Sequence, residues 1–503
     1  MKNNLKISVM LAAVLSVTAC TDLVEKPYSE ALQADFFTNA KSFEAALVPA
    51  YASLRGYIWN YWNISQHSSD ETQVPTRGGD WGDGGQWVRI NSQQFLPNEG
   101  LLDGLYGDLF TGVSRCNNAI ETFKGAPDSV KEKAIFVAEA RTLRAFYYYL
   151  LMDMFGNVPI VELALSDPAN PPAQSTRAQV FAFCEKELKE SIPGLLTDAP
   201  YARINKNVAN AILAKLYLNA EVFTGTARFA DCITACDAVI NSGKYSLEAN
   251  YFDNFKLANE GSKESIMVAG FTSTKDLGFP NQNFYMRTLH YNQVAANAWN
   301  GFCTVSEFYN TFDAADPRRQ VMWVGQQFSD LTWPTQSRAG RPLNDRNGIP
   351  LAFTPESPIT NASESNGIRI PKYQPDLAAP GGQGENDFVI LRLADIILSK
   401  AEALARSGNT AAALPLVNQV RARAFGNTSK NLTSITVPMI LKERGNELFW
   451  EGFRRQDQIR FGTFWDAYTN KPSTIADRNK TNLYPIPTNA LASNPKLKQN
   501  PGY

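Results

Sequence analysis

Histidine is nearly absent from this chain of 503 residues, in which only His67 and His290 occur. Histidine is the commonest acid–base residue of enzymes and a frequent metal ligand, so a histidine-based catalytic centre or zinc cluster has little to be built from. The chain also lacks a G-x-S-x-G elbow, an H-E-x-x-H sequence and a P-loop. The sequence therefore predicts no catalytic residue, no metal site and no cofactor.

Cysteine is scarce as well. Beyond Cys20 there are five cysteines at irregular spacing, an odd number that does not suit a disulfide framework: Cys116, Cys184, Cys232, Cys236 and Cys303. Cys232 and Cys236 stand one helical turn apart, which fits a metal or redox pair. With so few histidines, we favour the other interpretation, two small residues on the buried face of a helix.

An excess of charge of either sign is also missing. Removing Lys2 and Lys6 from the 48 basic residues leaves 46, against 49 acidic residues. Nucleic-acid binding asks for clustered positive charge, so no nucleic-acid partner is predicted. After the first 20 residues, no segment is apolar and long enough to span a bilayer, which takes about 20 residues.

The first residues have the layout of a secretory signal peptide, with two lysines followed by an apolar run from Ile7 to Ala19. The run ends in Val17-Thr18-Ala19-Cys20, which resembles the lipobox of bacterial lipoproteins. That resemblance implies a signal peptide at 1–19, a lipid on Cys20 and a polar tether over 20–34. An ordinary signal peptide with a chance cysteine is the alternative.

Helical periodicity dominates the rest of the chain. A long helix is predicted over 132–155 and another over 177–192. Two helix pairs follow, each close to the 34-residue unit of tetratricopeptide repeats: 207–223 with 229–240, and 391–405 with 414–424. Such short pairs bury their apolar faces only by stacking, so a superhelical scaffold is expected. Pro415 suits a helix interior poorly, which suggests that the last helix begins later than its pattern does.

Between the helical parts, residues 244–388 show little helical rhythm but many aromatic residues, which argues against disorder. We expect one domain over 35–503, in which a scaffold formed by about 35–243 and 389–503 carries a loop-rich variable region over about 244–388.

Four segments together resemble the SusD/RagB family, the nutrient-uptake outer-membrane lipoproteins of Bacteroidetes. They lie in order behind the lipobox and cover the chain from end to end: Glu139–Tyr148 with Phe155–Ile160, Leu391–Asp395 with Asn418–Arg423, Glu443–Arg455, and Tyr484–Pro487 with Gln499–Tyr503.

The resemblance implies a mostly α-helical fold with four tetratricopeptide-like helix pairs forming a SusD-like α-superhelical scaffold. It also implies attachment to the cell outer membrane, facing the exterior, and a partner, a TonB-dependent SusC-like transporter. Members of the family capture oligosaccharides, or in some cases peptides, and pass them to that transporter.

The charged residues of the third segment are interpreted as scaffold. Glu443, Glu447 and Glu451 stand four residues apart with arginines within one or two turns, a spacing that produces pairs along one helix worth about 0.2–0.5 kcal/mol each. Trp450, Trp465 and at least one of the three tyrosines Tyr147–Tyr149 are assigned to packing.

A sugar-binding site needs aromatic faces for stacking and a few fixed polar groups for the hydroxyls. Binding residues usually lie in loops on a rigid scaffold, so we look for candidates in the loops. Three stretches qualify: the glycine-rich 70–87, then 281–299, and the part that holds Trp323 and Trp333. Arg369 and Tyr373 are more simply interpreted as a strand. The candidate ligand-binding residues are Asp70, Trp81, Trp87, Arg287, Tyr291, Trp299 and Trp323, with Arg77, Asp80 and Asp83 as further polar groups of the first stretch. The opposing interpretation is that the loop tryptophans fill the scaffold.

The sequence leaves several functions open. The favoured one is a binding lipoprotein that captures a glycan. The alternatives are a peptide-binding protein of the same fold, a simple adhesion protein, and a lipid-anchored glycoside hydrolase, which needs only two carboxylates at a suitable separation.

Overall fold

A computed structural model describes residues 37, 39–165, 167, 169–271, 284–294, 298–378, 384–471 and 478–503 of the protein. The predicted signal peptide, Cys20 and the tether lie outside these residues. Among the helices that are described, none is both long and apolar enough to cross a membrane.

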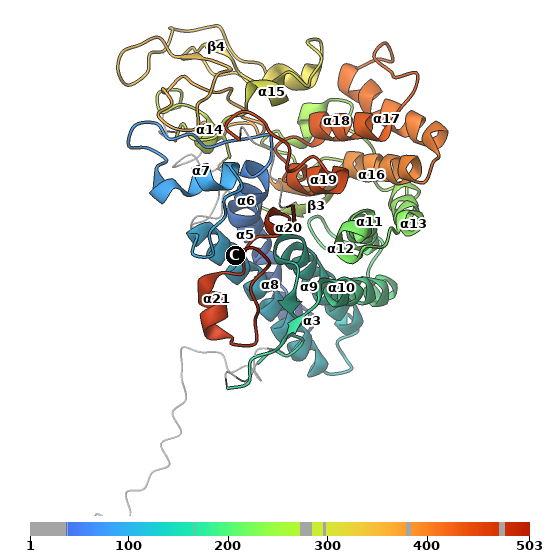
Figure 1. The fold of residues 1–503 in the computed structure, drawn as a ribbon. Helices are drawn as coiled ribbons and strands as arrows, with labels where there is room; N and C mark the ends of the chain where they lie inside the picture. Colours follow the sequence, from blue (N-terminus) through green and yellow to red (C-terminus); the bar gives the residue numbers. More distant parts are fainter. Residues whose placement is uncertain are drawn as a thin grey trace, which may run out of the picture.

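Three long helices form the lower part of the molecule as drawn in Figure 1: α8 (Gly100–Lys124), α9 (Lys133–Phe155) and α10 (Arg177–Ser191). Helix α9 packs against both of the others, and Tyr147, Tyr148 and Tyr149 are all buried. It ends where Gly156 adopts a positive φ of 71°. The prediction of a helix over 132–155 is confirmed.

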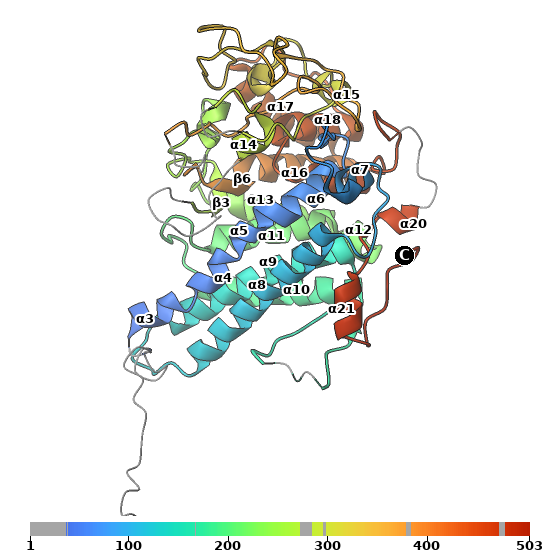
Figure 2. The same cartoon turned by 90° about the vertical axis from the view of Figure 1, so that its left-hand side faces the viewer.

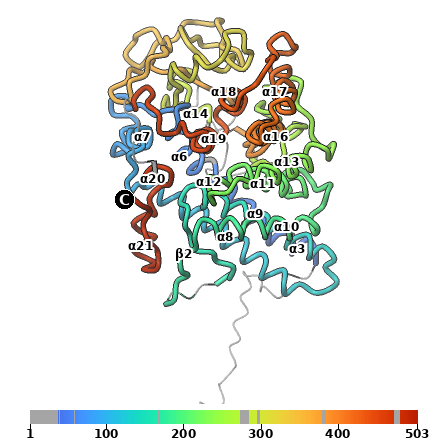
Figure 3. Tube along the Cα trace, turned by 45° about the vertical axis from the view of Figure 1, so that its right-hand side comes forward, coloured from blue at the N-terminus to red at the C-terminus, as the bar shows by residue number. Residues whose placement is uncertain are grey.

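The predicted helix pairs stack on this layer, as the trace in Figure 3 shows. The first pair comprises α11 (Lys206–Leu218) and α13 (Phe229–Ile240), joined through the short α12 (Ala220–Thr224). The second comprises α16 (Leu393–Arg406) and α17 (Thr410–Phe425), and α18 (Val437–Leu448) covers it. Because α13 packs on α16, the two pairs form one continuous core. Cys232 and Cys236 are buried on α13, as the packing interpretation predicted.

The expectation about Pro415 is wrong. Helix α17 begins at Thr410, ahead of the proline, where the side chain of Asn409 accepts a hydrogen bond from the N–H of Ala412. Capping stabilises the first turn by about 1 kcal/mol, and the packing of Ala413 and Val417 holds the following turn. Together they tolerate a proline that removes one hydrogen bond of the helix.

The chain between α13 and α16 is made of short elements, many of which lie at the upper end of Figures 1 and 2. In the part that the structure describes, no helix of this region exceeds five residues. The two longer strands, β3 and β6, pair antiparallel with Val268 opposite Val389. The elements are η4 (Tyr251–Asn254), β3 (Ser265–Ala269), α14 (Phe284–Thr288), α15 (Ser306–Tyr309), η5 (Pro317–Val321), β4 (Gly325–Gln326), β5 (Ala352–Phe353) and β6 (Phe388–Arg392).

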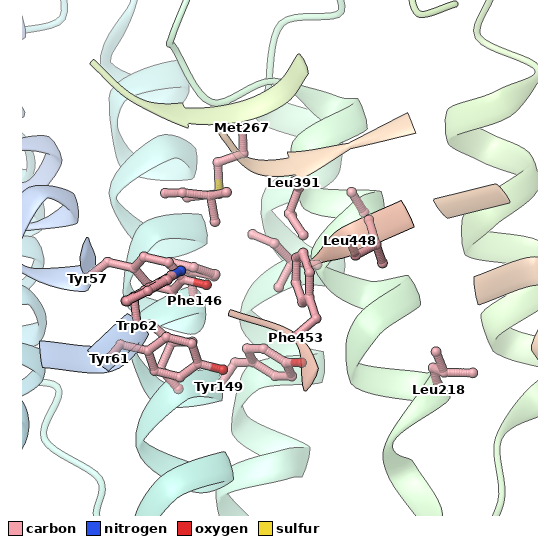
Figure 4. Packing of buried hydrophobic residues seen from close by; sticks show 14 of the residues in the cluster. Tyr57, Tyr61, Trp62, Phe146, Tyr149, Leu218, Met267, Leu391, Leu448 and Phe453 are labelled. Carbon is pink, nitrogen blue, oxygen red and sulfur yellow. The ribbon is translucent and has the colours of Figure 1, made fainter. Parts of the chain in front are cut away.

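The first described helices run along one side of the molecule, the side that faces the viewer in Figure 2. They are α3 (Ala40–Ala45), α4 (Val48–Ala52), α5 (Leu54–Gly56), the π-helix η1 (Tyr57–Tyr61), α6 (Trp62–His67), η2 (Asp83–Gly85) and α7 (Gln86–Asn91). Figure 4 shows Tyr57, Tyr61 and Trp62 turned toward Phe146 and Tyr149 in the core. Helices α19 (Arg454–Phe461), α20 (Arg478–Thr481) and α21 (Thr488–Ser493) end the chain.

The glutamates of α18 do not form the short-range pairs along one helix that their spacing predicted. Glu447 is fully buried and accepts from Arg318 at 2.9 Å, from Arg392 at 2.6 Å and from Arg423. These arginines come from η5, β6 and α17, so the carboxylate joins the loop-rich region to the scaffold. The interpretation of these residues as structural holds, but the pairs are long-range and buried.

Candidate functional site

The first predicted ligand stretch, 70–87, lies across two other loops. The backbone N–H of Gln73 donates to the carbonyl of Cys303 at 2.9 Å, and the N–H of Cys303 returns a bond at 3.1 Å. The N–H of Thr76 donates to Ile359 at 3.0 Å. Backbone pairing thus fixes the stretch against segments from the loop-rich region.

Trp81 links the first predicted stretch to the second. Its indole Nε1–H donates to the carbonyl oxygen of Trp299 at 2.8 Å. Its ring packs beside Phe302, with the centroids 5.4 Å apart. The ring also lies so close to Gly301 that a methyl group there would come within 2.3 Å of Trp81 Cε2. Trp81 and Trp299 are both half-buried.

A polar cluster stands next to these tryptophans. The Tyr291 hydroxyl donates to Asp80 Oδ2 at 2.5 Å, and Arg346 Nη2 donates to the same oxygen at 2.6 Å. The Arg346 guanidinium lies 3.9 Å from the centroid of the Tyr291 ring. Arg346 Nε also donates to Glu364 Oε1 at 2.5 Å, and His290 Nε2 lies 2.8 Å from Glu364 Oε2. We call Asp80, His290, Tyr291, Arg346 and Glu364 the polar cluster.

The cluster holds fixed protonation states near neutral pH. The hydrogen bond from Tyr291, together with Arg346, lowers the pKa of Asp80. Burial opposes ionisation of Glu364, but the bonds from Arg346 outweigh it and lower the pKa of that carboxyl. Burial lowers the pKa of His290 and keeps it neutral. Since His290 Nδ1 accepts from the N–H of Asn292 at 3.1 Å, the ring proton lies on Nε2 and faces Glu364.

Part of the polar cluster is open to a ligand. The Arg346 side chain is 47% exposed and that of Asp80 is 38% exposed. A fixed guanidinium and a fixed carboxylate beside half-buried tryptophans can bind the hydroxyl groups of a sugar whose ring stacks on an aromatic face. Within the described ranges, no group of three or more histidine, cysteine or acidic side chains is placed to hold a metal ion.

Two predicted ligand residues offer no ring face in this structure. Trp87 is 3% exposed and donates from Nε1 to Asp83 Oδ2 at 2.6 Å, while Trp323 is 2% exposed and donates to the carbonyl of Pro334 at 3.0 Å. The expectation that these rings face solvent is corrected, because each fills a hydrophobic cluster beneath its loop. Ligand binding by the seven candidate residues stays a prediction.

Asp70 and Arg287 lie close to the scaffold. Both carboxylate oxygens of Asp70 accept from Arg454 of α19, at 2.6 and 2.7 Å. Arg287 is buried, and its guanidinium lies 4.5 Å from the ring of Trp59. Arg77, Arg369 and Tyr373 are also buried, and Arg77 donates to the backbone carbonyls at 363 and 366.

Three residues escaped the sequence analysis: Trp59, Arg346 and Glu364. Arg346 and Glu364 lie in polar loops that resemble many others, and only the fold brings Arg346 to Asp80 and Glu364 to His290. Trp59 lies in the mainly apolar segment Tyr57–Tyr61, whose composition is typical of a hydrophobic core. In the structure, however, the Trp59 side chain is exposed.

A separate apolar groove lies between α3–α5 and the loop Tyr201–Arg203, with a volume of about 660 Å³. Its wall is mainly carbon, and the ion pairs of Arg203 with Glu44 and Glu139 are satisfied within the protein. It therefore lacks the convergent polar groups that sugar binding requires.

Comparison with known families matches the chain in two parts. Residues 224–503 match the SusD family, and residues 25–218 match a family described as "Starch-binding associating with outer membrane". The Starch-binding protein SusD of Bacteroides thetaiotaomicron is 24% identical over 468 residues, covering 84% of this chain and 82% of that protein. SusD-like protein P2 of Formosa agariphila is 23% identical over 539 residues, covering 98% of each chain.

Solved structures share the fold. A laminarin binding SusD-like protein superposes with a TM-score of 0.74 at 23% identity, covering 93% of this chain and 100% of the other. Surface glycan-binding protein A from Bacteroides thetaiotaomicron, in complex with laminarihexaose, gives a TM-score of 0.71 at 21% identity, covering 92% and 100%.

Proposed function

The chain belongs to the SusD family, and from that premise we propose that it is a surface lipoprotein that captures oligosaccharides or polysaccharide and delivers them to a TonB-dependent SusC-like transporter. Lipidation at Cys20 would hold it on the outer membrane with the binding face outward. It acts by binding, without catalysis. Similar proteins that bind starch, laminarin and laminarihexaose support the ligand class.

The observation that carries the proposal is the meeting of Trp81, Trp299 and the polar cluster. Three separate loops converge there, and each is fixed by hydrogen bonds to another. A ligand therefore meets a preformed site, which reduces the entropy lost on binding. The indoles supply stacking surfaces, and Asp80 and Arg346 supply an acceptor and a donor for neighbouring hydroxyls.

The polar cluster also explains why binding, rather than hydrolysis, is proposed. A glycosidase needs a carboxylic acid whose pKa is raised so that it can protonate the leaving group. Asp80 and Glu364 have lowered pKa values, so both are anions at neutral pH. Two anions clamped by one arginine can accept hydrogen bonds but lack the proton that the reaction requires.

The test is calorimetry of a soluble protein that starts at Thr21, titrated with a panel of polysaccharides and oligosaccharides. Saturable binding to one glycan class with no cleavage products supports capture. Cleavage would overturn the binding role, and no binding across the panel would direct the search to peptides. Trp81→Ala should weaken the binding of a positive ligand by about 1 kcal/mol or more.

A further inference from the structure

Trp59 is an exposed tryptophan in a segment whose residues Tyr57, Asn60 and Tyr61 are buried. Its neighbours Tyr57 and Tyr61 are buried and stacked on each other, with the ring centroids 4.6 Å apart. Trp59 lies between them in sequence, yet it is 42% exposed. An exposed indole costs hydrophobic free energy, which a protein recovers when a partner covers it.

The local backbone is what turns Trp59 outward. Tyr57–Tyr61 form a π-helix, in which the N–H of Trp62 donates to the carbonyl of Tyr57. A π-helical turn holds one residue more than an α-helical turn, so it shifts the faces of the helix relative to each other. Tyr57, Tyr61 and Trp62 all reach the core, and Trp59 takes the outer face. Such turns cost stability and occur frequently at functional sites.

The inner side of the indole is supported by a fixed group. The guanidinium of Arg287 lies 4.5 Å from the ring centroid of Trp59, and Arg287 Nη1 donates to Asn63 Oδ1 at 3.3 Å. Arg287 is buried, so its guanidinium supports the indole from the protein side, while Trp59 is 42% exposed. An indole held in this way loses little conformational entropy when a flat ligand stacks on it.

Trp59 is connected to the predicted ligand loops by two side chains. Arg287 lies between Trp59 and Phe302, at 5.7 Å from the Phe302 ring, and Phe302 packs against Trp81. Trp59 belongs to η1, between α5 and α6, and Arg287 belongs to α14. The helices α5, α6, α7 and α14 occupy the left side of Figure 1, which faces the viewer in Figure 2. Trp59 and Trp81 are thus linked through Arg287 and Phe302, which are both buried.

We propose that Trp59 is a second sugar-stacking platform, and that the binding surface extends from Trp81 to Trp59 to take an oligosaccharide of several units. This inference rests on the proposed glycan-binding function. A short sugar occupies the Trp81 end, where the polar cluster supplies hydrogen bonds. Only a longer chain reaches Trp59, so Trp59 sets how strongly affinity grows with chain length.

The experiment measures affinities for one oligosaccharide series, from disaccharide to octasaccharide, cut from a polysaccharide that the protein binds. Trp59→Ala should weaken the longest members about fivefold or more and leave the shortest unchanged. Trp59→Tyr, which keeps a ring, should retain most of the affinity. Leu165→Ala is the matched control, because it removes an exposed apolar side chain from a loop next to α10.

Each outcome bears on a different claim. If the unaltered protein binds no glycan, the proposed function fails and this inference fails with it. If the protein binds the series and Trp59→Ala retains full affinity for every length, only the second platform is overturned. Equal weakening at all lengths also overturns it, because that result places Trp59 at the first subsite or in the fold. Melting temperatures of all variants separate unfolding from lost contacts.

Discussion

The indole N–H of Trp81 donates to the carbonyl oxygen of Trp299 at 2.8 Å, across 218 positions of the sequence. This bond ties the glycine-rich loop to the loop-rich region and fixes the orientation of the Trp81 ring. Gly301, two residues after Trp299, makes the arrangement possible, since the ring occupies the space where a side chain would stand. The position of one aromatic face therefore depends on a glycine that makes no polar contact with it.

Gly301→Ala should displace the Trp81 ring, because the added methyl would lie 2.3 Å from Cε2 and 2.4 Å from Cζ2. The ring must rotate away or break its bond to Trp299. We expect glycan affinity to fall about as far as in Trp81→Ala, on the order of 1 kcal/mol or more, although the indole is retained. Calorimetry with a bound oligosaccharide measures the loss.

Gly79→Ala is the control for that change. Gly79 belongs to the same loop, and a methyl there meets no atom within 4 Å. Its affinity should equal that of the unaltered protein. If Gly301→Ala binds equally well and Trp81→Ala does not, the orientation of the ring has no role in binding.

Sequence patterns located the loops of the candidate site but not its geometry. Tryptophan among glycine and aspartate marked 70–87, and that stretch does lie beside Tyr291 and Trp299. The same composition could not separate Trp81, which is half-buried, from Trp87, which is buried. The two tryptophans have similar neighbours in the sequence and differ only in the residues that pack over them in the fold. Arg346 reaches Asp80, and Glu364 reaches Arg346, through tertiary contacts. No local pattern distinguishes these two residues from other charged loop residues.

Arg346→Ala should weaken glycan binding by about 1–3 kcal/mol, since it removes a charged donor and the group that orients Asp80 and Glu364. The fold should be retained, because nearly half of the Arg346 side chain faces solvent. Arg341→Ala, which removes an exposed arginine from the same loop, should bind normally. Equal losses in both variants would indicate a general effect of charge.

Binding by the unaltered protein should resist acid. Tyr291 and Arg346 lower the pKa of Asp80, and Arg346 lowers that of Glu364, so both carboxyls stay ionised as pH falls into the ordinary carboxyl range of about 4. Affinity should hold down to that range and drop below it. In Arg346→Ala the carboxyl pKa values rise, so the drop should move to higher pH. Titrations at several pH values in both proteins test this shift.

The scaffold was easier to predict than the site, because helical periodicity is a local signal. The pairs α11–α13 and α16–α17 were placed from apolar spacing alone. The partners of the charged residues of α18 were predicted wrongly, because ion pairs between distant segments leave no local signal in the sequence. Spacing along one helix suggests neighbours on that helix, whereas Glu443 and Glu447 pair with arginines brought by η5, β6 and α17.

Glu447→Gln should destabilise the protein strongly. Burial alone would raise the pKa of Glu447, but Arg423, Arg392 and Arg318 outweigh it and lower the pKa to about 2. Removing the charge leaves these buried arginines short of a partner, at a cost of about 3–5 kcal/mol. Glu121→Gln, in an exposed pair with Lys124 at 2.8 Å, should change the free energy of unfolding very little. Urea unfolding of both variants gives the comparison.

Acid should weaken the same contact in the unaltered protein. Because the folded-state pKa of Glu447 lies below the ordinary glutamate value of about 4.3, its contribution to stability is complete above that value. The contribution is lost as pH falls toward 2. The stability difference between the protein and Glu447→Gln should therefore shrink over that interval, and a constant difference would contradict the assignment.

Glu71 makes the opposite case, a buried carboxyl whose pKa burial raises to about 8. One oxygen accepts the backbone N–H of Trp450, a bond that a neutral side chain can also receive. The folded protein then binds a proton that the unfolded chain releases, so stability falls as pH rises from about 4.3 to 8. The variant Glu71→Gln keeps the side-chain shape and the oxygen that accepts from Trp450, but its stability does not depend on protonation at this position. It should stabilise the protein by on the order of 1–3 kcal/mol at neutral pH, and this gain should grow as pH rises from about 4.3 to 8. Unfolding free energies at pH 5 and pH 8 measure the gain, and a gain independent of pH would mean that Glu71 is ionised in the folded protein.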